Sequence, residues 1–492
     1  MTPSSIPTYT IGKNLQITRA VTGLWQIADM ERDQKKLDHS ALADAMHAYA
    51  AAGFTTFDMA DHYGSAEDIS GEYVKKYARQ QPMQLLTKWV PEPGAISRNQ
   101  VQQALDRARK RLQVDVIDLL QFHAWNYADP SWLDGLFYLQ EFKERGIIRN
   151  LGVTNFDTAH LRIAVKSGIE IATNQICFSL LDQRAARDMT TLCLETGVRL
   201  LAFGTLAGGF LSNRWLGKVE PALNESLTWS QMKYKRFIDT AGGWARYQQL
   251  LQTLHEVASA RKVSIANLAT RYMLEQPAVA AVIIGARLGE SEHLRDNAAL
   301  FSFDLSNEDK EKIAAALQSL HSIPGDCGDE YRKPPFLTAS GDLSHHVSKF
   351  PAPYSTVERE GKTRVQTGTV WEGLAGYARA VRSGNIINVS GSTSNHGTRP
   401  IGGTDPAAQT HFIIDKIEGA LQSLGGRLED VVRTRIFVQN IADWEPVARA
   451  HGQRFGHILP ANTLVEAKLV GQGNLVEIEA DAIITRAGTS PG

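Results

Sequence analysis

The first 320 residues alternate short apolar runs with amphipathic runs, and this alternation limits the chain to few folds. The apolar runs have the length of strands, and the amphipathic runs have the 3.6-residue period of helices. Strands that alternate with helices predict a parallel sheet. The expected strands are Ile17–Trp25, Thr55–Phe57, Gln84–Thr87, Val116–Phe122, Asn150–Val153, Ile169–Asn174, Val198–Phe203 and Val279–Ile284.

The segments between these strands carry helix stop signals. Lys35–Ala52 is followed by Gly53, and glycine commonly ends a helix. About eight β/α units favour a (β/α)8 TIM barrel. An open doubly wound sheet is disfavoured, because no GxGxxG motif follows the first strand. Further helices are expected at Arg98–Leu112, Trp132–Arg145, Ala185–Thr196 and Ile265–Gln276.

Residues 322–362 break this rhythm, because they are rich in Pro, Gly, Ser and Asp and have no sustained period. We interpret them as a linker between a barrel at 1–321 and a second domain at 363–487. The second domain groups its expected strands around two helices, Ala407–Leu424 and Trp444–Phe455. This grouping predicts a smaller α+β fold of two layers.

Composition excludes several classes of function. The formal net charge is -1, so the chain has no strong field that would attract nucleic acid or an anionic membrane. No apolar run approaches the length of a membrane span, and the first residues lack the apolar segment of a signal peptide. The three cysteines have no CxxC spacing and are expected to be reduced. We therefore expect a cytoplasmic protein without nucleic-acid or membrane partners.

Polar residues gather at the ends of three expected strands, where TIM barrels carry their active sites. Asp58 and Tyr63 follow the second strand, Lys88 ends the third and His123 the fourth. These side chains suit carbonyl reduction, in which hydride addition leaves negative charge on oxygen and a proton donor is required. Tyr63 can donate the proton, and a neighbouring ammonium from Lys88 would lower its pKa. Asp58 can hold Lys88, His123 can bond to the oxygen, and no metal is needed.

The segment FDMADHYGSAE at 57–67 resembles the signature of the aldo-keto reductase family, whose catalytic tetrad consists of Asp, Tyr, Lys and His. GVTNF at 152–156 and IIGAR at 283–287 resemble two further segments of that family. The resemblance implies an NADPH-dependent reductase with Asp58, Tyr63, Lys88 and His123 as catalytic residues. It also implies that NADPH is bound by Thr154, Asn155, Gln175, Phe203, Gly204, Thr205, Leu206, Gly285, Arg287 and Asn297.

For two of these residues, the chemistry of the side chain indicates how it would bind the cofactor. Phe203 would stack on the nicotinamide ring, and the Arg287 guanidinium would favour NADPH because it can make paired bonds to a 2′-phosphate. Three tryptophans at strand ends, Trp25, Trp89 and Trp125, are candidate walls of the substrate pocket. Core packing is an alternative for each of them. The partner is a small carbonyl compound whose identity the sequence does not give.

The second domain resembles the RidA (YjgF/YER057c/UK114) family in GYARAV at 376–381, INVSG at 387–391 and PANT at 460–463. The resemblance implies a chorismate-mutase-like fold, a homotrimer and a ligand cleft. The family's imine hydrolysis uses an arginine after the Pro-Ala pair, where this chain has Asn462, which carries no charge for a carboxylate. The residues implied to line the cleft are Tyr377, Ser390, Asn462 and Glu477.

The favoured function is therefore reduction of an aldehyde or ketone by the barrel, with a second domain for assembly or for binding a small ligand. Two alternatives stay open. The chain could be a bifunctional reductase and imine hydrolase, or a non-catalytic NADP-binding regulatory subunit. The intact tetrad argues against the regulatory alternative.

Overall fold

A computed structural model describes residues 6–485, except 225, 292, 333–334 and 339–341. Its larger part is a closed barrel of eight parallel strands in the order β10-β3-β4-β5-β6-β7-β8-β9. The fold predicted for the first part of the chain, a (β/α)8 TIM barrel, is confirmed. The strands are β3 (Ala20–Gly23), β4 (Thr56–Asp58), β5 (Gln84–Trp89), β6 (Ile117–His123), β7 (Ile148–Thr154), β8 (Ile171–Cys177), β9 (Arg199–Phe203) and β10 (Val279–Gly285).

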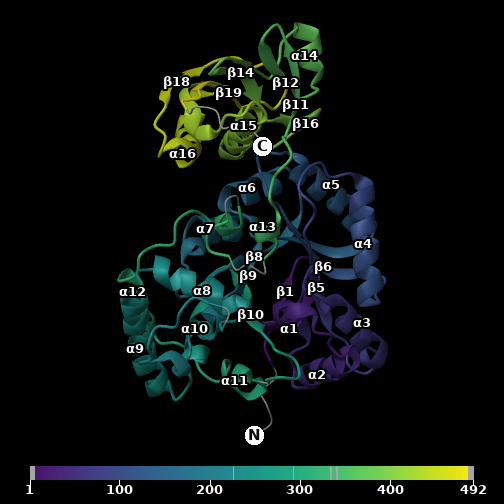
Figure 1. Cartoon of the computed structure of the whole chain (residues 1–492), viewed down its shortest axis with the longest axis vertical. Helices are drawn as coiled ribbons and strands as arrows, with labels where there is room; N and C mark the ends of the chain where they lie inside the picture. Colours follow the sequence, from purple (N-terminus) through teal and green to yellow (C-terminus); the bar gives the residue numbers. More distant parts are fainter. Residues whose placement is uncertain (1–5, 225, 292, 333–334, 339–341, 486–492) are drawn as a thin grey trace.

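Helices surround the barrel (Figure 1). Local sequence signals set the ends of two of these helices. Ser264 accepts a hydrogen bond from the backbone N–H of Asn267, and Gly197 ends its helix with φ of 79°. The helices are α1 (Trp25–Met30), α2 (His39–Ala51), α3 (Ala66–Tyr77), α4 (Arg98–Leu112), α5 (Ser131–Glu144), α6 (Thr158–Lys166), α7 (Asp188–Thr196), α8 (Trp229–Thr240), α9 (Trp244–Arg261), α10 (Ile265–Leu274), α11 (Leu294–Ala299) and α12 (Asn307–Gln318).

The opening strand expected at Ile17–Trp25 is divided in the structure. Its first part is β2 (Leu15–Thr18), which pairs with β1 (Thr8–Ile11) in an antiparallel hairpin outside the barrel sheet. Its second part is β3, and Trp25 already begins α1. Ile11, Leu15 and Ile17 are buried against apolar side chains of the barrel strands, so the hairpin covers apolar surface of the barrel.

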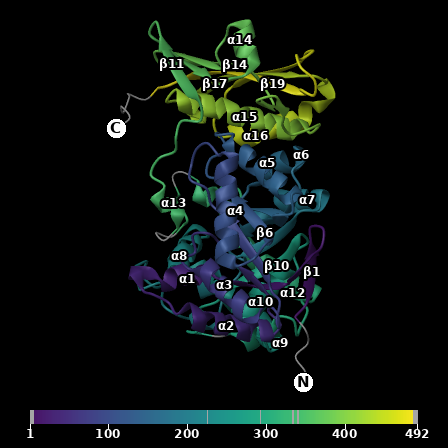
Figure 2. The ribbon, with the colours of Figure 1, turned by 90° about the vertical axis from the view of Figure 1, so that its right-hand side faces the viewer.

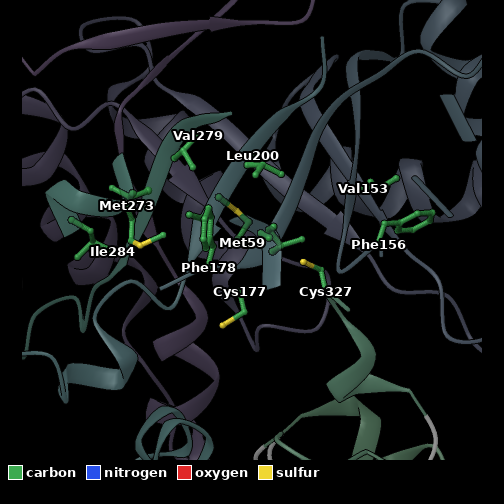
Figure 3. Packing of buried hydrophobic residues seen from close by; sticks show 14 of the residues in the cluster. Met59, Val153, Phe156, Cys177, Phe178, Leu200, Met273, Val279, Ile284 and Cys327 are labelled. Atoms are coloured by element: carbon green, nitrogen blue, oxygen red, sulfur yellow. The ribbon is translucent and has the colours of Figure 1, made fainter. Parts of the chain in front are cut away.

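The barrel core continues from the strands to the surrounding helices. Met59, Phe178 and Leu200 are fully buried in it (Figure 3). All three cysteines are buried and free, as their spacing predicts. Burial raises the pKa of the Cys177 and Cys327 thiols well above its usual value, so neither is a reactive thiolate.

The second domain is a seven-stranded sheet with two long helices on one face. The strand order is β11-β12-β13-β14-β19-β17-β18, and the helices lie between the sheet and the barrel (Figure 2). This arrangement agrees with the predicted α+β fold of the RidA type. The elements are β11 (Ser355–Arg359), β12 (Lys362–Gln366), α14 (Val370–Ala375), β13 (Ala380–Ser383), β14 (Ile386–Thr393), β15 (Asn395–His396), β16 (Arg399–Pro400), α15 (Pro406–Ser423), β17 (Val431–Val438), α16 (Trp444–Phe455), β18 (Ala461–Glu466) and β19 (Val476–Ile483).

The described residues between the two domains contain three short elements of secondary structure. Within the expected linker, Asp329–Tyr331 forms a 3-10 turn and α13 spans Leu343–His346. The same range also contains β11, which pairs with β12 and extends the sheet of the second domain. Gly328 has φ of 84°, and a Cβ there would lie 2.0 Å from the carbonyl oxygen of Asn155. Only glycine allows the segment to approach the barrel this closely.

The two domains meet along α6 of the barrel and α15 of the second domain. At the centre of this interface, His160 Nδ1 lies 2.6 Å from an oxygen of Asp157, and its Nε2 lies 3.0 Å from an oxygen of Asp415. Burial lowers the pKa of His160, but the two carboxylates outweigh this effect and raise it to about 9. A charged imidazole therefore joins the domains at neutral pH.

Candidate active site

The four predicted catalytic side chains lie around one cavity of about 480 Å³ at the carboxyl ends of the barrel strands. Lys88 is buried, and its Nζ donates to Asp58 Oδ2 at 2.6 Å and to the carbonyl oxygen of Met59 at 2.8 Å. The same ammonium lies 4.8 Å from the ring centroid of Tyr63. The Asp58–Lys88 pair thus forms the floor of the cavity below Tyr63.

Two glutamines hold Asp58 in place from across the barrel. Gln175 donates to Asp58 Oδ1 at 2.7 Å, and Gln121 donates to the same oxygen at 3.1 Å. Gln175 also donates to the side-chain oxygen of Gln121 at 3.0 Å. Both oxygens of Asp58 therefore have donors, as a buried carboxylate requires. The sequence motifs did not identify Gln121, which lies two residues before His123 and, like it, points into the barrel.

Tyr63 and His123 are both neutral in this environment. Burial, supported by the charge of Asp58, raises the pKa of Tyr63 well above its usual value. This differs from the expectation that Lys88 would lower it, because the Lys88 charge is compensated by Asp58. Burial also lowers the pKa of His123 well below its usual range, and Arg332 adds to this effect. Neither ring nitrogen of His123 has a hydrogen-bond partner among the described residues.

The wall beside the tetrad has unpartnered polar atoms that fit a nicotinamide cofactor. Asn155 Oδ1 and Thr205 Oγ1 are buried and have no partner among the described residues. Asn155 has φ of 59°, and its backbone N–H donates to the carbonyl oxygen of Gln175 at 2.9 Å. Gly204 has φ of 75°, and a Cβ there would lie 2.1 Å from the Tyr234 hydroxyl. A carboxamide could satisfy the Asn155 oxygen, which favours a nicotinamide at this wall.

The predicted phosphate ligand, Arg287, is engaged with two carboxylates. Its Nη1 lies 2.8 Å from Asp29 Oδ2, and its Nε lies 2.7 Å from Glu290 Oε2. The pKa of Arg287 is raised, because these two bonds outweigh its partial burial. A phosphate at this position would share the guanidinium with Asp29 or displace it.

The structure brings most of the predicted site residues to this one cavity. Beside the tetrad, the predicted residues that line it are Trp25, Trp125, Thr154, Asn155, Gln175, Phe203, Gly204, Thr205, Leu206, Gly285 and Arg287.

Two predicted residues do not line it. Trp89 packs in the core, with its ring 5.7 Å from that of Phe122. Successive residues of a strand point to opposite faces, so Trp89 turns outward because Lys88 points into the barrel. Asn297 lies on α11, outside the lining of the cavity.

Three residues that the motifs did not identify complete the mouth of the cavity. Lys233 comes from α8, whereas Tyr331 and Asp342 come from the segment between the domains. The ring of Tyr331 lies 6.1 Å from the ring of His123 in an edge-to-face arrangement. No motif could have identified Tyr331 and Asp342, because they reach the cavity only through the packing of the segment between the domains, and Lys233 lies on a helix without a recognised motif.

Residues 20–318 match the family model described as "Aldo/keto reductase family". The chain belongs to this family. Its members are oxidoreductases, and the tetrad, the barrel and the unpartnered atoms at the cavity wall are what such an enzyme needs.

Relatives of this aldo/keto reductase are distant. It is 26% identical over 324 residues to Protein tas of Escherichia coli (strain K12), which covers 57% of this chain and 89% of that protein. It is 24% identical over 334 residues to the NADH-specific methylglyoxal reductase of the same organism, covering 62% and 97%.

Solved structures agree with the barrel fold. The glycerol dehydrogenase AKR11B4 of Gluconobacter oxydans superposes with a TM-score of 0.52 at 20% identity, covering 66% of this chain and 98% of that one. The Bombyx mori aldo-keto reductase AKR2E4, solved in complex with NADP, superposes with a TM-score of 0.50 at 19% identity, covering 68% and 100%. At this level of identity the likeness concerns the fold alone.

The second domain of the aldo/keto reductase matches another family model. Residues 369–484 match "Endoribonuclease L-PSP", and this region is RidA-like. Rv2704 of Mycobacterium tuberculosis, a member of the YjgF/YER057c/UK114 family, is 44% identical, covering 25% of this chain and 99% of that one with a TM-score of 0.23.

Within one chain, the four predicted cleft residues of the second domain do not meet. Tyr377 lies beside Arg379, whose Nη2 is 3.1 Å from its hydroxyl, and the Ser390 hydroxyl donates to the carbonyl oxygen of Ala378 at 2.8 Å. Glu477 lies against Gly391 next to them.

Asn462 is on β18, two strands away from β19 in the sheet. Its side chain donates to Thr434 Oγ1 at 2.9 Å, and Thr434 in turn contacts His451 of α16. Asn462 therefore points to the helix layer, away from Glu477. Within a single chain, Asn462 is therefore bonded to Thr434 and does not lie with the other predicted cleft residues.

Other kinds of site are not found in the described parts of the chain. No group of three or more His, Cys, Asp or Glu side chains there could hold a metal ion. Among the same residues, no helix is both long and apolar enough to cross a membrane.

Proposed function

We propose that this aldo/keto reductase uses NADPH to reduce an aldehyde or ketone to an alcohol, with Tyr63 as the general acid. The observation that carries the proposal is the meeting of Tyr63, His123 and the Asp58–Lys88 pair at one cavity. When bound, the reduced nicotinamide supplies the hydride. The residues of this chain supply the proton, the orientation of the carbonyl and a dry environment.

Each side chain has one role in this proposal. The Tyr63 hydroxyl holds the proton that passes to the carbonyl oxygen, and Lys88 stabilises the phenolate that remains. His123 is neutral, so it donates a hydrogen bond to the same oxygen without adding a charge. Asn155 and Thr205 have unpartnered atoms that support binding of the nicotinamide.

The preference for NADPH rests on Arg287. A guanidinium near the ribose favours a 2′-phosphate, because it can form two charge-assisted bonds to it. Asp29 and Glu290 weaken this argument without removing it, because both carboxylates lie on the same guanidinium. One relative of this chain is an NADH-specific methylglyoxal reductase, so the preference between NADPH and NADH has to be measured.

The test of this function is oxidation of NADPH, and of NADH in parallel, by the full chain with a panel of aldehydes and ketones. We expect turnover with at least one aldehyde and a higher kcat/KM for NADPH. Tight NADPH binding with no turnover across the panel would instead favour the regulatory subunit.

For the RidA-like domain we propose assembly of a homotrimer in preference to imine hydrolysis. Exposed apolar side chains support this, since Val432, Ile386 and Val465 of its strands are each more than two-fifths exposed in the single chain. The uncharged Asn462, bonded to Thr434, argues against the binding of a substrate carboxylate.

A further inference from the structure

Lys233 is a buried lysine in the catalytic cavity that forms no ion pair within the described part of the chain. It lies on α8 with 7% of its surface exposed, and it lines the cavity of the tetrad. Its Nζ donates to the hydroxyl of Tyr331 and makes no ion pair with any described carboxylate. An ammonium has three donors, so two of them have no hydrogen-bond partner among the residues that the structure describes.

Three aromatic rings surround this ammonium. The ring centroids of Tyr331, Phe203 and Tyr234 lie 4.5, 5.1 and 5.7 Å from the Lys233 Nζ. The rings attract the cation weakly through their π faces, but they cannot replace the water that burial removes. A buried charge without a counter-ion is costly, so the site is arranged for an anion that is absent from the chain itself.

The acidic residues near Lys233 do not supply that anion. Glu330 is paired with Arg184 at 2.9 Å. Asp342 lines the same cavity but forms no ion pair with Lys233. Burial raises the pKa of Asp342, although the charge of Lys233 acts in the opposite direction.

Tyr331 links Lys233 to the catalytic residues. The Tyr331 ring contacts the Lys233 ammonium on one side and lies 6.1 Å from the His123 ring on the other. The Lys233 ammonium and His123, the predicted oxyanion donor, also line the same cavity. A small molecule can reach both groups at once.

We propose that Lys233 binds a carboxylate of the substrate, so that this site selects carbonyl compounds that carry a negative charge at the end remote from the carbonyl. The inference rests on the proposed reductase function and names its substrate class. The anion bound by Lys233 could also come from a phosphate of the cofactor, and the experiment separates these two sources.

The experiment compares two probes that differ only in charge, 4-carboxybenzaldehyde and its neutral methyl ester, methyl 4-formylbenzoate. We expect the wild-type chain to have the higher kcat/KM for the acid. Lys233→Met should lower kcat/KM for the acid about 10- to 100-fold, the range of a hydrogen bond to a charged group, and leave the ester within a few-fold. Lys233→Arg should retain most of the preference, and the Kd for NADPH should not change.

Lys235→Met is the matched control, because Lys235 lies on the same helix but is paired with Asp239 and Glu220 outside the cavity. It should not alter the ratio of acid to ester. An equal loss for both probes in Lys233→Met, or a weaker Kd for NADPH, would overturn the inference in favour of a structural or cofactor role. Wild-type turnover of the ester without preference for the acid would overturn the inference alone. Turnover of other aldehydes of the panel but of neither probe would also overturn the inference, whereas no turnover of any compound of the panel would count against the reductase function itself.

Discussion

At the scale of single residues, the active site depends on which charges are compensated. The charge of Lys88 is compensated by Asp58 below the reacting centre, whereas Lys233 at the mouth forms no ion pair with the carboxylates that the structure describes. His123 is neutral, and neither of its ring nitrogens is hydrogen-bonded to another residue in the described parts of the chain. Under the inference above, an anionic substrate would bind to the unpaired charge of Lys233 at the mouth. The paired charge of Lys88 beside Tyr63 would be unaffected, so the protonation of Tyr63 would not change.

The cofactor preference can be tested at Arg287 with two opposite substitutions. Arg287→Met removes the guanidinium, so the Kd for NADPH should rise about tenfold or more, while the Kd for NADH changes little. Asp29→Asn removes a competing carboxylate and should tighten NADPH binding instead. Fluorescence titration of both cofactors measures the four changes. Equal weakening of NADPH and NADH by Arg287→Met would mean that the guanidinium does not contact the 2′-phosphate.

At the scale of elements, the segment between the domains contributes residues to the wall of the cavity that holds the tetrad. Tyr331 and Asp342 line the cavity, and an amino group of Arg332 donates to the carbonyl oxygen of Asn155 at 2.8 Å. The sequence could not show this, because Pro, Gly and Ser mark loops without saying where they pack. The tetrad was predictable because its members lie at the carboxyl ends of strands or just after them, and parallel strands in a barrel end at one face.

The same reasoning explains what the sequence could not distinguish. Trp89 and Trp125 both follow a predicted catalytic residue, but only Trp125 lies beyond the end of its strand, where it reaches the cavity. Trp89 is still within β5 and turns to the core. The ends of strands are uncertain by a residue or two in a sequence, and such an error reverses the direction of a side chain.

The α6–α15 contact predicts a pH-dependent stability. His160 has a pKa of about 9 in the folded chain and about 6.5 when unfolded. Its contribution is therefore fully present below about pH 6.5 and is lost as the pH rises through about 9, and it amounts to roughly 3 kcal/mol. The Tm difference between wild type and His160→Gln should be large at pH 6 and small near pH 10.

A second histidine at the same interface serves as the control. His396 lies 2.8 Å from Asp134, but both side chains are partly exposed, so solvent screens the pair. His396→Gln should therefore lower the Tm little at any pH. If the loss of Tm in His160→Gln were the same at pH 6 and pH 10, the charged imidazole would not be what joins the domains.

At the scale of the whole molecule, the chain places a RidA-like sheet on the outside of an aldo/keto reductase. The helices α15 and α16 face the barrel, which leaves the other face of the sheet turned away from it (Figure 2). If three chains associate through that face, the three barrel mouths stay separate and each active site is complete within one chain. The RidA-like domain would then determine how many active sites one oligomer contains.

The trimer can be tested without removing a domain. Val465 is 43% exposed on β18, so Val465→Asp should cost the single chain little but place a carboxylate in any interface formed by the sheet. Light scattering after gel filtration should give a trimer for wild type and smaller species for Val465→Asp. Val219→Asp, at a position that is 90% exposed on the barrel domain, should leave the trimer intact. A monomeric wild type would contradict the proposed assembly.

The most direct test of the reductase mechanism is to measure both the Kd for NADPH and the kcat of the Tyr63→Phe variant. Removal of one hydroxyl leaves the ring that contacts Lys88 and Trp25 in place, so the Kd for NADPH should stay within a few-fold of wild type. Loss of the proton donor should lower kcat by about 10²- to 10⁴-fold. Turnover close to that of wild type, with NADPH bound normally, would contradict the assignment of Tyr63 as the acid.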